Sequence, residues 1–320
     1  MAINKPKEAL IAITYRCNAK CHMCNTWMHP TRPEEEIRPS DLESLPSVRF
    51  CNITGGEPFI REDIKSFVEV MSKKAKRIVI STNGYYTEKI VDLARQYPKI
   101  GIRVSMEGLQ KANDELRGIK DGFEHGLRTL KELRKMGLKD IGFGITLSDR
   151  NILDLMDLHK LSEEMGLEFA TAAVHNTYYF HKFDNKITRL DDFDRELEKL
   201  ITNLLKGGRP KNWFRAYFNY GLLNYAHGNK RLLPCEVGTD LFFIDPFGNV
   251  MPCNGVDMSM GNIREKPFNE IWNGGQAEKV REAVRECKKE CWMIGSVSPA
   301  MKKNIIVPAL WVLKNKIMKR

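Results

Sequence analysis

Short β-prone runs alternate with amphipathic stretches over residues 9–175. The six strand candidates are rich in β-branched and other apolar residues and span 9–17, 48–56, 76–84, 100–108, 140–148 and 167–175. Between them lie helical stretches, of which 122–137 and 152–166 show apolar residues near i, i+3, i+4 and i+7. Six successive βα units predict an α/β fold with a parallel sheet, either open or curled into a partial barrel.

Polar residues and glycines gather where these strands are expected to end. Ligand sites in parallel α/β folds lie at the carboxyl ends of the strands, so these residues are expected to share one rim. The residues at this rim are Cys17, Gly55–Glu57, Ser81–Gly84, Ser105, Glu107, His175 and Asn176. Their common position predicts a single functional site.

The pattern changes beyond residue 190. Residues 190–206 predict one more helix, and a loop-rich aromatic stretch is expected over 212–228. Residues 235–295 carry four cysteines and a predicted hairpin that turns at Asp245–Gly248. We therefore expect a barrel with its following helix over 1–209, a small cysteine-rich domain over 210–295 and a basic tail over 296–320.

Composition narrows the class of protein. The chain has 320 residues, 42% of them hydrophobic, which excludes global disorder and allows a sizeable core. The net charge is +10, but the last twenty residues hold six basic groups and no acidic one, so the rest carries +4 and no nucleic-acid partner is expected. No signal peptide and no run of 18 apolar residues is seen, which makes a cytoplasmic protein the default and metal binding the natural use of its eight cysteines.

Three cysteines near the start are the clearest chemical signal. Cys17, Cys21 and Cys24 form Cys-x3-Cys-x2-Cys in the loop after the first predicted strand. Three thiolates are one ligand short of closing a tetrahedral iron or zinc site, and an open position on a metal is where chemistry occurs. The alternative is a zinc knuckle, with His22 or His29 as its fourth ligand.

The cysteine trio, followed by GGEP after the second strand, resembles the radical S-adenosylmethionine (SAM) superfamily. Met23 stands where an aromatic residue is commoner in that family. The resemblance implies a partial (β/α)6 TIM-like barrel in which the trio holds a [4Fe–4S] cluster and SAM binds the open iron. It further implies reductive cleavage of SAM to a 5′-deoxyadenosyl radical, hydrogen abstraction from a substrate, and a reducing partner such as flavodoxin or ferredoxin.

Other positions match the SAM-binding pattern of this family in the correct order along the chain. The resemblance implies backbone contacts from the GGE segment to the amino group of SAM, and an arginine in NDELRG that pairs with its carboxylate. The matching positions are Met23, Gly55, Gly56, Glu57, Ser81, Asn83, Ser105, Glu107, Arg117 and Ile145.

A second cysteine set consists of Cys235, Cys253, Cys287 and Cys291. With Gly248 before Cys253, its spacing resembles the twitch domain, a shortened SPASM domain that follows the barrel in this superfamily. The resemblance implies one auxiliary [4Fe–4S] cluster ligated entirely by protein. A structural zinc site with the same four ligands is the alternative. The remaining cysteine, Cys51, lies in an apolar run and is expected in the core.

The sequence says less about the substrate than about the fold or the cofactors. Loop 174–185 follows the sixth strand and offers four substrate-facing candidates, although a packed aromatic loop explains it equally well; the candidates are His175, Asn176, Tyr178 and His181. By resemblance we expect a radical SAM oxidoreductase that dehydrogenates a carbohydrate-like or small polar molecule, with the auxiliary cluster as electron acceptor. The alternatives are a peptide maturase that forms thioethers or epimerises, modification of a lipid or envelope saccharide, and a non-catalytic zinc- or SAM-binding module.

The basic tail predicts an amphipathic helix that begins near Pro308, with Leu310, Leu313 and Ile317 on one face. Such a helix can make peripheral contact with an anionic membrane. It can equally dock on the barrel through Leu310 and Trp311, which we favour because the helix is short and its polar face is not cleanly segregated.

Overall fold

The computed structural model describes residues 5–318, and six parallel strands make up most of its nine-stranded sheet. All six strands expected from the sequence are present: β1 (Glu8–Ala12), β2 (Phe50–Thr54), β3 (Ile78–Thr82), β4 (Gly101–Ser105), β5 (Ile141–Leu147) and β6 (Glu168–Ala173). They pair in chain order, each parallel to the next. The expected α/β fold with a parallel sheet is therefore confirmed.

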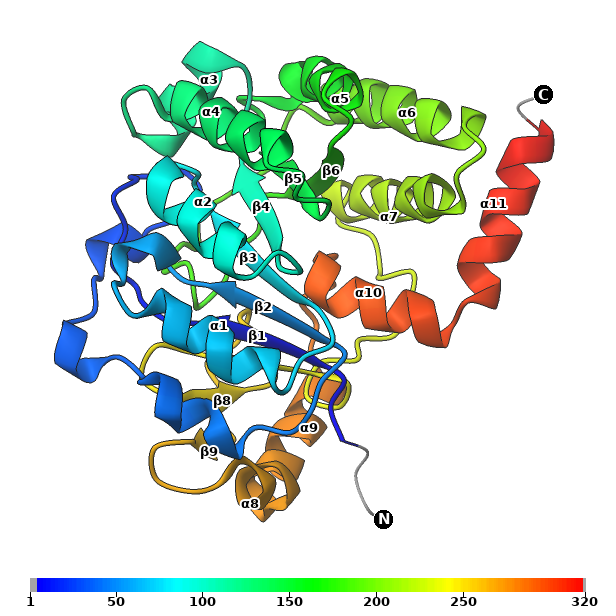
Figure 1. Ribbon diagram of the computed structural model, residues 1–320. Coiled ribbons are helices and arrows are strands. Elements are labelled where there is room, and N and C mark those ends of the chain that lie inside the picture. The colour runs from blue at the N-terminus through cyan, green and yellow to red at the C-terminus, as the bar shows by residue number, and fades with distance from the viewer. Residues whose placement is uncertain (1–4, 319–320) are drawn as a thin grey trace.

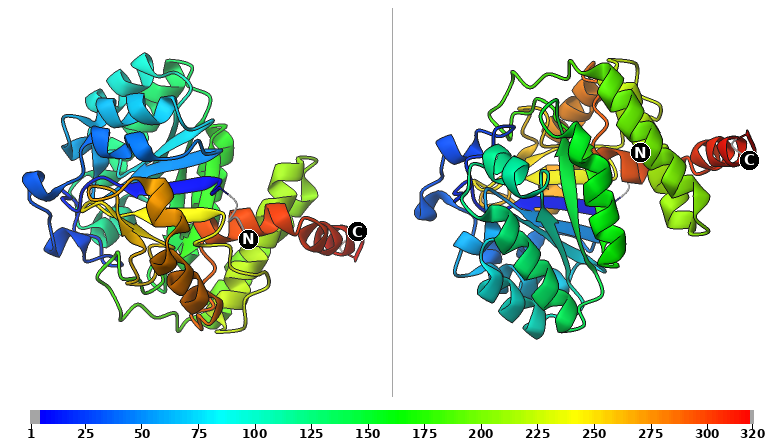
Figure 2. Two further views of the ribbon diagram at one scale, coloured as in Figure 1. Left: turned by 90° about the horizontal axis from the view of Figure 1, so that it is seen from below. Right: turned by 90° about the horizontal axis from the view of Figure 1, so that it is seen from above.

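Helices that connect these strands cover the outer side of the curved sheet (Figures 1 and 2). They are α1 (Ile64–Ser72), α2 (Thr87–Gln96), α3 (Gln110–Arg117), α4 (Gly122–Lys135) and α5 (Leu155–Glu164). In α4, Phe123, Leu130 and Leu133 are buried, and their spacing of i, i+7 and i+10 places them on one face of the helix. Cys51 is fully buried in β2, which confirms its place in the core.

The C-terminal cysteine-rich segment extends the same sheet. The expected hairpin is present as β7 (Leu241–Ile244) and β8 (Asn249–Met251), followed by β9 (Gly261–Asn262). Strand β7 pairs in parallel with β1, with Ile11 opposite Ile244. This pairing places β1, which leads to the first cysteine trio, between the GGE-bearing β2 and the segment that bears the second cysteine set.

Two long helices follow β6, and the second corrects our expectation. Helix α6 (Leu190–Lys206) lies where predicted, but the stretch 212–228 is not loop-rich, because its residues up to Ala226 belong to α7 (Pro210–Ala226). Trp213, Tyr217 and Tyr220 recur at i, i+4 and i+7, and proline is favourable at the first position of a helix. The aromatic residues that suggested a loop instead form one packing face of a helix.

The chain ends in four helices: α8 (Phe268–Asn273), α9 (Gly275–Arg285), α10 (Ile294–Lys303) and α11 (Ile306–Met318). The tail thus forms two helices where one was expected. In α11, Trp311 stacks on Tyr220 of α7 with ring centroids 5.0 Å apart, which confirms docking through Trp311. Docking through Leu310 is wrong, because that side chain is 60% exposed.

Candidate active site

The trio Cys17, Cys21 and Cys24 lies in a loop held from both sides. Strand β1 ends at Ala12, earlier than expected, but extended pairing to β2 continues beyond it: the N–H of Ile13 donates to Thr54 O at 2.9 Å. The loop is then tied to α3, where the N–H of His22 donates to Leu116 O at 2.8 Å. These contacts fix the loop at the carboxyl end of the sheet, where the site was predicted.

The three thiols are partly shielded from water. Burial raises the pKa of the Cys17 thiol to about 12 and that of Cys21 to about 11, and the nearby Arg117 guanidinium opposes both shifts. Burial also raises the pKa of Cys24, whose Sγ lies 3.0 Å from Thr26 Oγ1. Thiolates at these positions need a cationic group close to them, and an iron–sulfur cluster bound by thiolates supplies one. The donor set therefore fits the cluster implied by the resemblance.

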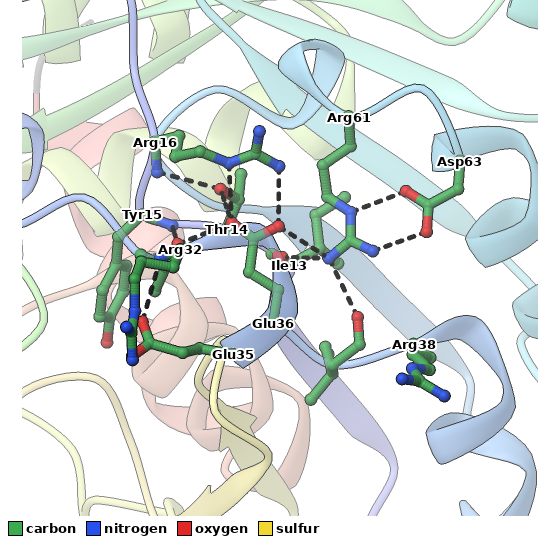
Figure 3. Close-up of polar contacts among 12 residues, drawn as sticks. Ile13, Thr14, Tyr15, Arg16, Arg32, Glu35, Glu36, Arg38, Arg61 and Asp63 are labelled. Atoms are coloured by element: carbon green, nitrogen blue, oxygen red, sulfur yellow. Dashed lines mark hydrogen bonds and ion pairs between the residues drawn. The ribbon is translucent and has the colours of Figure 1, made fainter.

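A buried ionic network anchors the start of this loop (Figure 3). The Glu36 carboxylate, whose residue is 2% exposed, accepts hydrogen bonds from the Thr14 hydroxyl, from the Thr31 hydroxyl at 2.6 Å and from Arg16 Nη2 at 2.8 Å. Arg61 Nη1 lies 3.3 Å from the same carboxylate. Arg16 directly precedes Cys17, so Glu36 fixes the backbone from which the first thiol projects.

Sequence reasoning missed this network. Glu36 is the last of three consecutive glutamates, a pattern typical of a solvated surface. The first two, Glu34 and Glu35, do face solvent with Arg32. Only the approach of residues 31–36 to β1, which is a tertiary contact, distinguishes Glu36 from its neighbours.

The Gly55–Gly56–Glu57 segment runs against the cysteine loop. The N–H of Gly56 donates to Thr14 O at 2.7 Å and the N–H of Glu57 donates to Arg16 O at 2.8 Å. A side chain on Gly56 would collide with the backbone of Arg16. Glycine is therefore required here for close backbone approach, which agrees with the reason given for it from the sequence.

The side chain of Glu57 serves the fold itself. It is fully buried, and one carboxylate oxygen accepts from the Thr82 hydroxyl at 2.8 Å, while the other accepts from the Asn83 N–H at 2.7 Å. Burial raises the pKa of this carboxyl, and these hydrogen bonds oppose the shift. Glu57 thus joins the end of β2 to the end of β3 and leaves only its backbone, and that of the two glycines, to face a ligand.

Glu107 and Arg117 form a buried ion pair behind the cysteine loop. Arg117 Nη1 donates to Glu107 Oε1 at 3.2 Å, and the other carboxylate oxygen accepts from the Thr146 N–H at 2.6 Å. Burial raises the pKa of Glu107, and Arg117 opposes that shift. The buried Arg117 Nε has no hydrogen-bond partner among residues 5–318. A buried guanidinium with a free N–H fits a carboxylate ligand, as the SAM-binding pattern implies.

The remaining predicted SAM contacts divide into polar and apolar positions. Asn83 Nδ2 donates to Asn18 Oδ1 at 2.7 Å, and the buried Nδ2 of Asn18 has no partner in the described part of the chain. Ser81 exchanges hydrogen bonds with Asn52, and Ser105 ends β4 at the same rim. Met23 packs with Leu116 and Val174, and Ile145 is buried in β5; both offer apolar surface only.

The four substrate candidates in loop 174–185 make different kinds of contact. Asn176 exchanges hydrogen bonds with Asn185 and closes the loop on itself. The His175 ring bonds through Nδ1 to Ala173 O at 2.9 Å, and burial lowers the pKa of this imidazole. Tyr178 and His181 instead join a ring cluster with Tyr15, two residues before Cys17, which we call the mouth cluster; they are the candidates that best fit substrate contact.

The mouth cluster consists of Tyr15, His29, Tyr178, His181 and Phe247, and only Tyr178 and His181 were expected from the sequence as substrate contacts. Their ring centroids lie between 4.4 and 6.0 Å apart in successive pairs. Backbone torsion φ is +49° at His181, a strained value for a residue with a side chain, and its buried Nε2 has no partner among the described residues. A strained histidine with a free ring nitrogen is a typical feature of a functional site.

Tyr179 connects this loop to both cysteine segments. Its hydroxyl donates to Gly55 O at 2.6 Å, and its carbonyl accepts from the Thr26 hydroxyl at 3.2 Å, beside Cys24. Its backbone N–H donates to Asn254 O at 3.2 Å, next to Cys253. The two cysteine sets, far apart in sequence, therefore share one buried neighbour.

The second cysteine set lines a cavity of about 60 Å³, together with Gly255, Met293 and other residues. All four thiols, those of Cys235, Cys253, Cys287 and Cys291, border it. Burial raises the pKa of Cys253 to about 12 and that of Cys291 to about 11. One water needs roughly 10–15 Å³ measured in this way, so the cavity has room for more than a single ion.

Within the part of the chain that the structure describes, no group of three or more His, Cys, Asp or Glu residues is arranged to hold one metal ion. A four-iron cluster places a separate iron at each thiolate, so its ligands stand further apart than those of a single zinc ion.

The sequence matches two known families in separate parts of the chain. The profile of the radical SAM superfamily matches residues 11–161, and that of an iron–sulfur cluster-binding domain, SPASM, matches residues 235–292. An AdoMet-dependent heme synthase of Methanosarcina barkeri is 25% identical and covers 90% of this chain and 88% of its own. The subtilosin biosynthesis protein AlbA of Bacillus subtilis is 25% identical over 87% of this chain and 62% of its own.

Two solved structures share the fold. Streptococcus suis SuiB bound to S-adenosylmethionine superposes with a TM-score of 0.68 at 19% identity, over 88% of this chain and 68% of its own. The enzyme anSMEcpe, solved with AdoMet and a peptide, superposes with a TM-score of 0.64 at 15% identity, over 98% of this chain and the full length of its own.

Proposed function

The chain belongs to the radical SAM superfamily and carries a SPASM-type iron–sulfur domain, and we propose that it dehydrogenates a carbohydrate-like or other small polar substrate in a two-electron oxidation. Its cofactors are SAM and iron–sulfur clusters. When bound, SAM and the first cluster supply the 5′-deoxyadenosyl radical for hydrogen abstraction, and the auxiliary cluster supplies an electron acceptor.

The observation that carries this proposal is the position of Tyr179. Its contacts with Gly55 and Asn254 bring the segment of the second cysteine set against the loop that borders the first. An electron acceptor beside the substrate permits removal of a second electron after hydrogen abstraction. A reaction that ends in radical recombination has no need of one.

In this proposal each cysteine set holds its own cluster. Cys17, Cys21 and Cys24 bind the first cluster, and Cys235, Cys253, Cys287 and Cys291 bind the auxiliary one. Arg117 receives the SAM carboxylate at its free Nε, and the backbone of Gly55 and Gly56 lies along the amino acid part of the cofactor. The buried network around Glu36 keeps these groups in fixed positions, so that the substrate carbon meets the radical in one orientation.

We further propose His181 as the proton acceptor. Oxidation of an alcohol carbon removes one hydrogen atom, one electron and the hydroxyl proton, and the proton needs a base on the protein. Burial lowers the pKa of His181, so its imidazole is neutral at pH 7, and its Nε2 is free of partners among the described residues. The surrounding rings of Tyr15, His29 and Tyr178 give a sugar ring apolar faces on which to pack.

A peptide substrate is the second candidate. Two proteins named above bear on it: AlbA, a relative in sequence, takes part in bacteriocin biosynthesis, and anSMEcpe, which shares the fold, was solved with a bound peptide. The exposed side chains of Met28 and Phe183 near the mouth would suit an apolar peptide residue.

Deuterium tracing separates these candidates. The reduced holoenzyme is incubated with SAM and deuterated candidate sugars, aminocyclitols or peptides, and 5′-deoxyadenosine and product are analysed by mass spectrometry. The proposal expects deuterium in 5′-deoxyadenosine from a sugar-like substrate and a product lighter by two hydrogens. Transfer from a peptide, with a thioether or inverted stereocentre in the product, would replace it with the second candidate.

A further inference from the structure

Two segments that pack together at one end of the molecule contain no acidic residue. Residues 199–235 and 291–320 carry thirteen of the 51 Lys and Arg residues and none of the 41 Asp and Glu residues, so the rest of the chain has a net charge of −3. The first segment includes the end of α6 and the whole of α7, and the second includes α10 and α11. The entire positive charge excess of the protein therefore belongs to these helices and the loops beside them.

Helix α11 docks on this basic end through one face. Trp311 stacks on Tyr220 and meets the edge of Tyr217 at 5.5 Å, and Val312 is buried. Lys316 Nζ donates to Leu205 O at 2.7 Å, at the end of α6. Because the carbonyls at a helix end favour a cation, this contact fixes the outer half of α11 in place.

The opposite face of α11 is apolar and exposed. Ile306, Leu310 and Leu313, spaced at i, i+4 and i+7, are 69%, 60% and 58% exposed. Figures 1 and 2 show α11 projecting beyond the rest of the molecule, so no other element lies over this face. Single exposed apolar residues are normal on soluble proteins, but a stripe on a projecting helix marks an interaction surface.

Unpaired cations flank the stripe. Lys314 lies beside it on α11. Lys206 ends α6, directly after the residue whose carbonyl Lys316 contacts, and Arg209 lies in the α6–α7 connection. All three are exposed, and none forms an ion pair with another residue in the range 5–318. An apolar stripe with free cations at its sides complements a surface that is anionic outside and apolar beneath.

We propose that the outward face of α11 binds the surface of an anionic lipid bilayer, with Ile306, Leu310 and Leu313 entering the headgroup region and Lys206, Arg209 and Lys314 facing lipid phosphates. No described helix is long and apolar enough to cross a membrane, so the contact is peripheral. The inward and outward faces of α11 are distinct, hence docking through Trp311 and lipid binding occur together.

A second copy of the chain fits this face less well. A symmetric dimer through the stripe would bring the unpaired cations Lys206, Arg209 and Lys314 of the two copies together, and like charges oppose such a contact. A bilayer containing phosphatidylglycerol offers the opposite charge over a wide area. The charge distribution therefore selects lipid over self-association.

Vesicle co-sedimentation of the full-length holoenzyme tests the proposal. Vesicles of phosphatidylcholine mixed with phosphatidylglycerol are compared with vesicles of phosphatidylcholine alone, at low and high salt. We expect binding to the mixed vesicles that weakens at high salt, and roughly tenfold or more weaker binding by the Leu310→Gln/Leu313→Gln variant. Leu153→Gln, which changes an exposed leucine in the turn before α5, is the matched control and should bind like the wild type.

Other results would overturn the proposal. No binding of the wild type to the mixed vesicles, equal binding to neutral ones, or full binding by the double variant each contradicts it. Sedimentation velocity of the same proteins adds an independent outcome, because a wild-type dimer that the double variant abolishes would assign the face to a second copy. Reductive SAM cleavage by the double variant should match that of the wild type, which shows that the variant is folded.

Discussion

The backbone N–H of Tyr179 donates a hydrogen bond to the carbonyl oxygen of Asn254, 3.2 Å away. Tyr179 follows the sixth strand of the barrel, whereas Asn254 directly follows a cysteine of the C-terminal domain. The hydroxyl of the same tyrosine reaches Gly55 O, in the segment expected to contact SAM. One buried residue thus couples the positions of the two cysteine sets and of the segment that we propose to contact SAM.

Replacing Tyr179 by phenylalanine tests that coupling. The substitution keeps the ring but removes the donor to Gly55 O, which leaves a buried carbonyl unsatisfied and costs about 1 kcal/mol. We expect the KM for SAM, measured by 5′-deoxyadenosine formation, to rise about fivefold. Tyr178→Phe changes the neighbouring, more exposed tyrosine and should leave this KM unaltered. An unchanged KM in Tyr179→Phe would show that the hydroxyl has no part in cofactor binding.

Disruption of the Glu36 network should lower both the free energy of unfolding and the amount of bound iron. Glu36→Gln removes the negative charge between Arg16 and Arg61, and breaking a buried ion pair in this way costs about 3 kcal/mol. We expect a lower midpoint in urea unfolding and a reduced iron content after anaerobic reconstitution. Glu35→Gln, one residue earlier and paired with Arg32 at the surface, should leave the urea midpoint and the iron content at their wild-type values. Equal behaviour of the two variants would rule out the anchoring role of Glu36.

Arg117→Lys tests the proposed carboxylate contact. Lysine keeps the charge near Glu107 but lacks the free guanidinium Nε, so it cannot present the same two donors. SAM affinity should fall about tenfold or more, while the iron content stays at the wild-type value. Arg128→Lys, an exposed arginine paired with Glu88, is the control. Retained SAM affinity in Arg117→Lys would assign the carboxylate to another residue.

The ion pairs of Asp140 should make part of the free energy of unfolding depend on pH. Burial alone would raise the pKa of its carboxyl, but Arg77 and Arg103 outweigh burial and lower the pKa from 3.8 to about 2. Because the folded-state pKa is depressed, the stabilisation is present above pH 3.8 and is lost as the pH falls from there to about 2. Asp140→Asn should therefore unfold more easily than wild type at pH 7, by about 1–2 kcal/mol after allowance for solvent screening.

The measurement is the difference in urea midpoint between Asp140→Asn and wild type at each pH. Iron–sulfur clusters are lost at low pH from both proteins alike, so the difference isolates the carboxyl. It should shrink as the pH falls below 3.8. A difference that stays constant between pH 7 and pH 2.5 would contradict the assignment of the stabilisation to ionised Asp140.

The sequence could predict those parts of the molecule that local pattern determines. The six strands follow from their β-branched runs, the β7–β8 hairpin from its turn residues, and the place of Gly56 from the close approach that only glycine permits. The cysteine spacings predicted two sites before any contact was visible. These features depend on residues close together in the chain.

Features that depend on distant segments could not be predicted in this way. The parallel pairing of β7 with β1 joins residues more than 230 positions apart, and no local pattern indicates it. Glu36 looks like its exposed neighbours until the chain folds back on β1. Residues 212–221 have a mixed aromatic composition, and their helical structure depends on packing against α6 and α11, which the local sequence does not indicate.

The most direct test of the account compares Cys24→Ala with Cys253→Ala in the reduced, anaerobically reconstituted enzyme, with 5′-deoxyadenosine formation as the readout. Two full clusters correspond to about eight irons per chain in the wild type. We predict that Cys24→Ala forms no 5′-deoxyadenosine, because its cluster site is the one that SAM needs, and that Cys253→Ala still forms it. Formation of 5′-deoxyadenosine by Cys24→Ala would contradict the central assignment of the site.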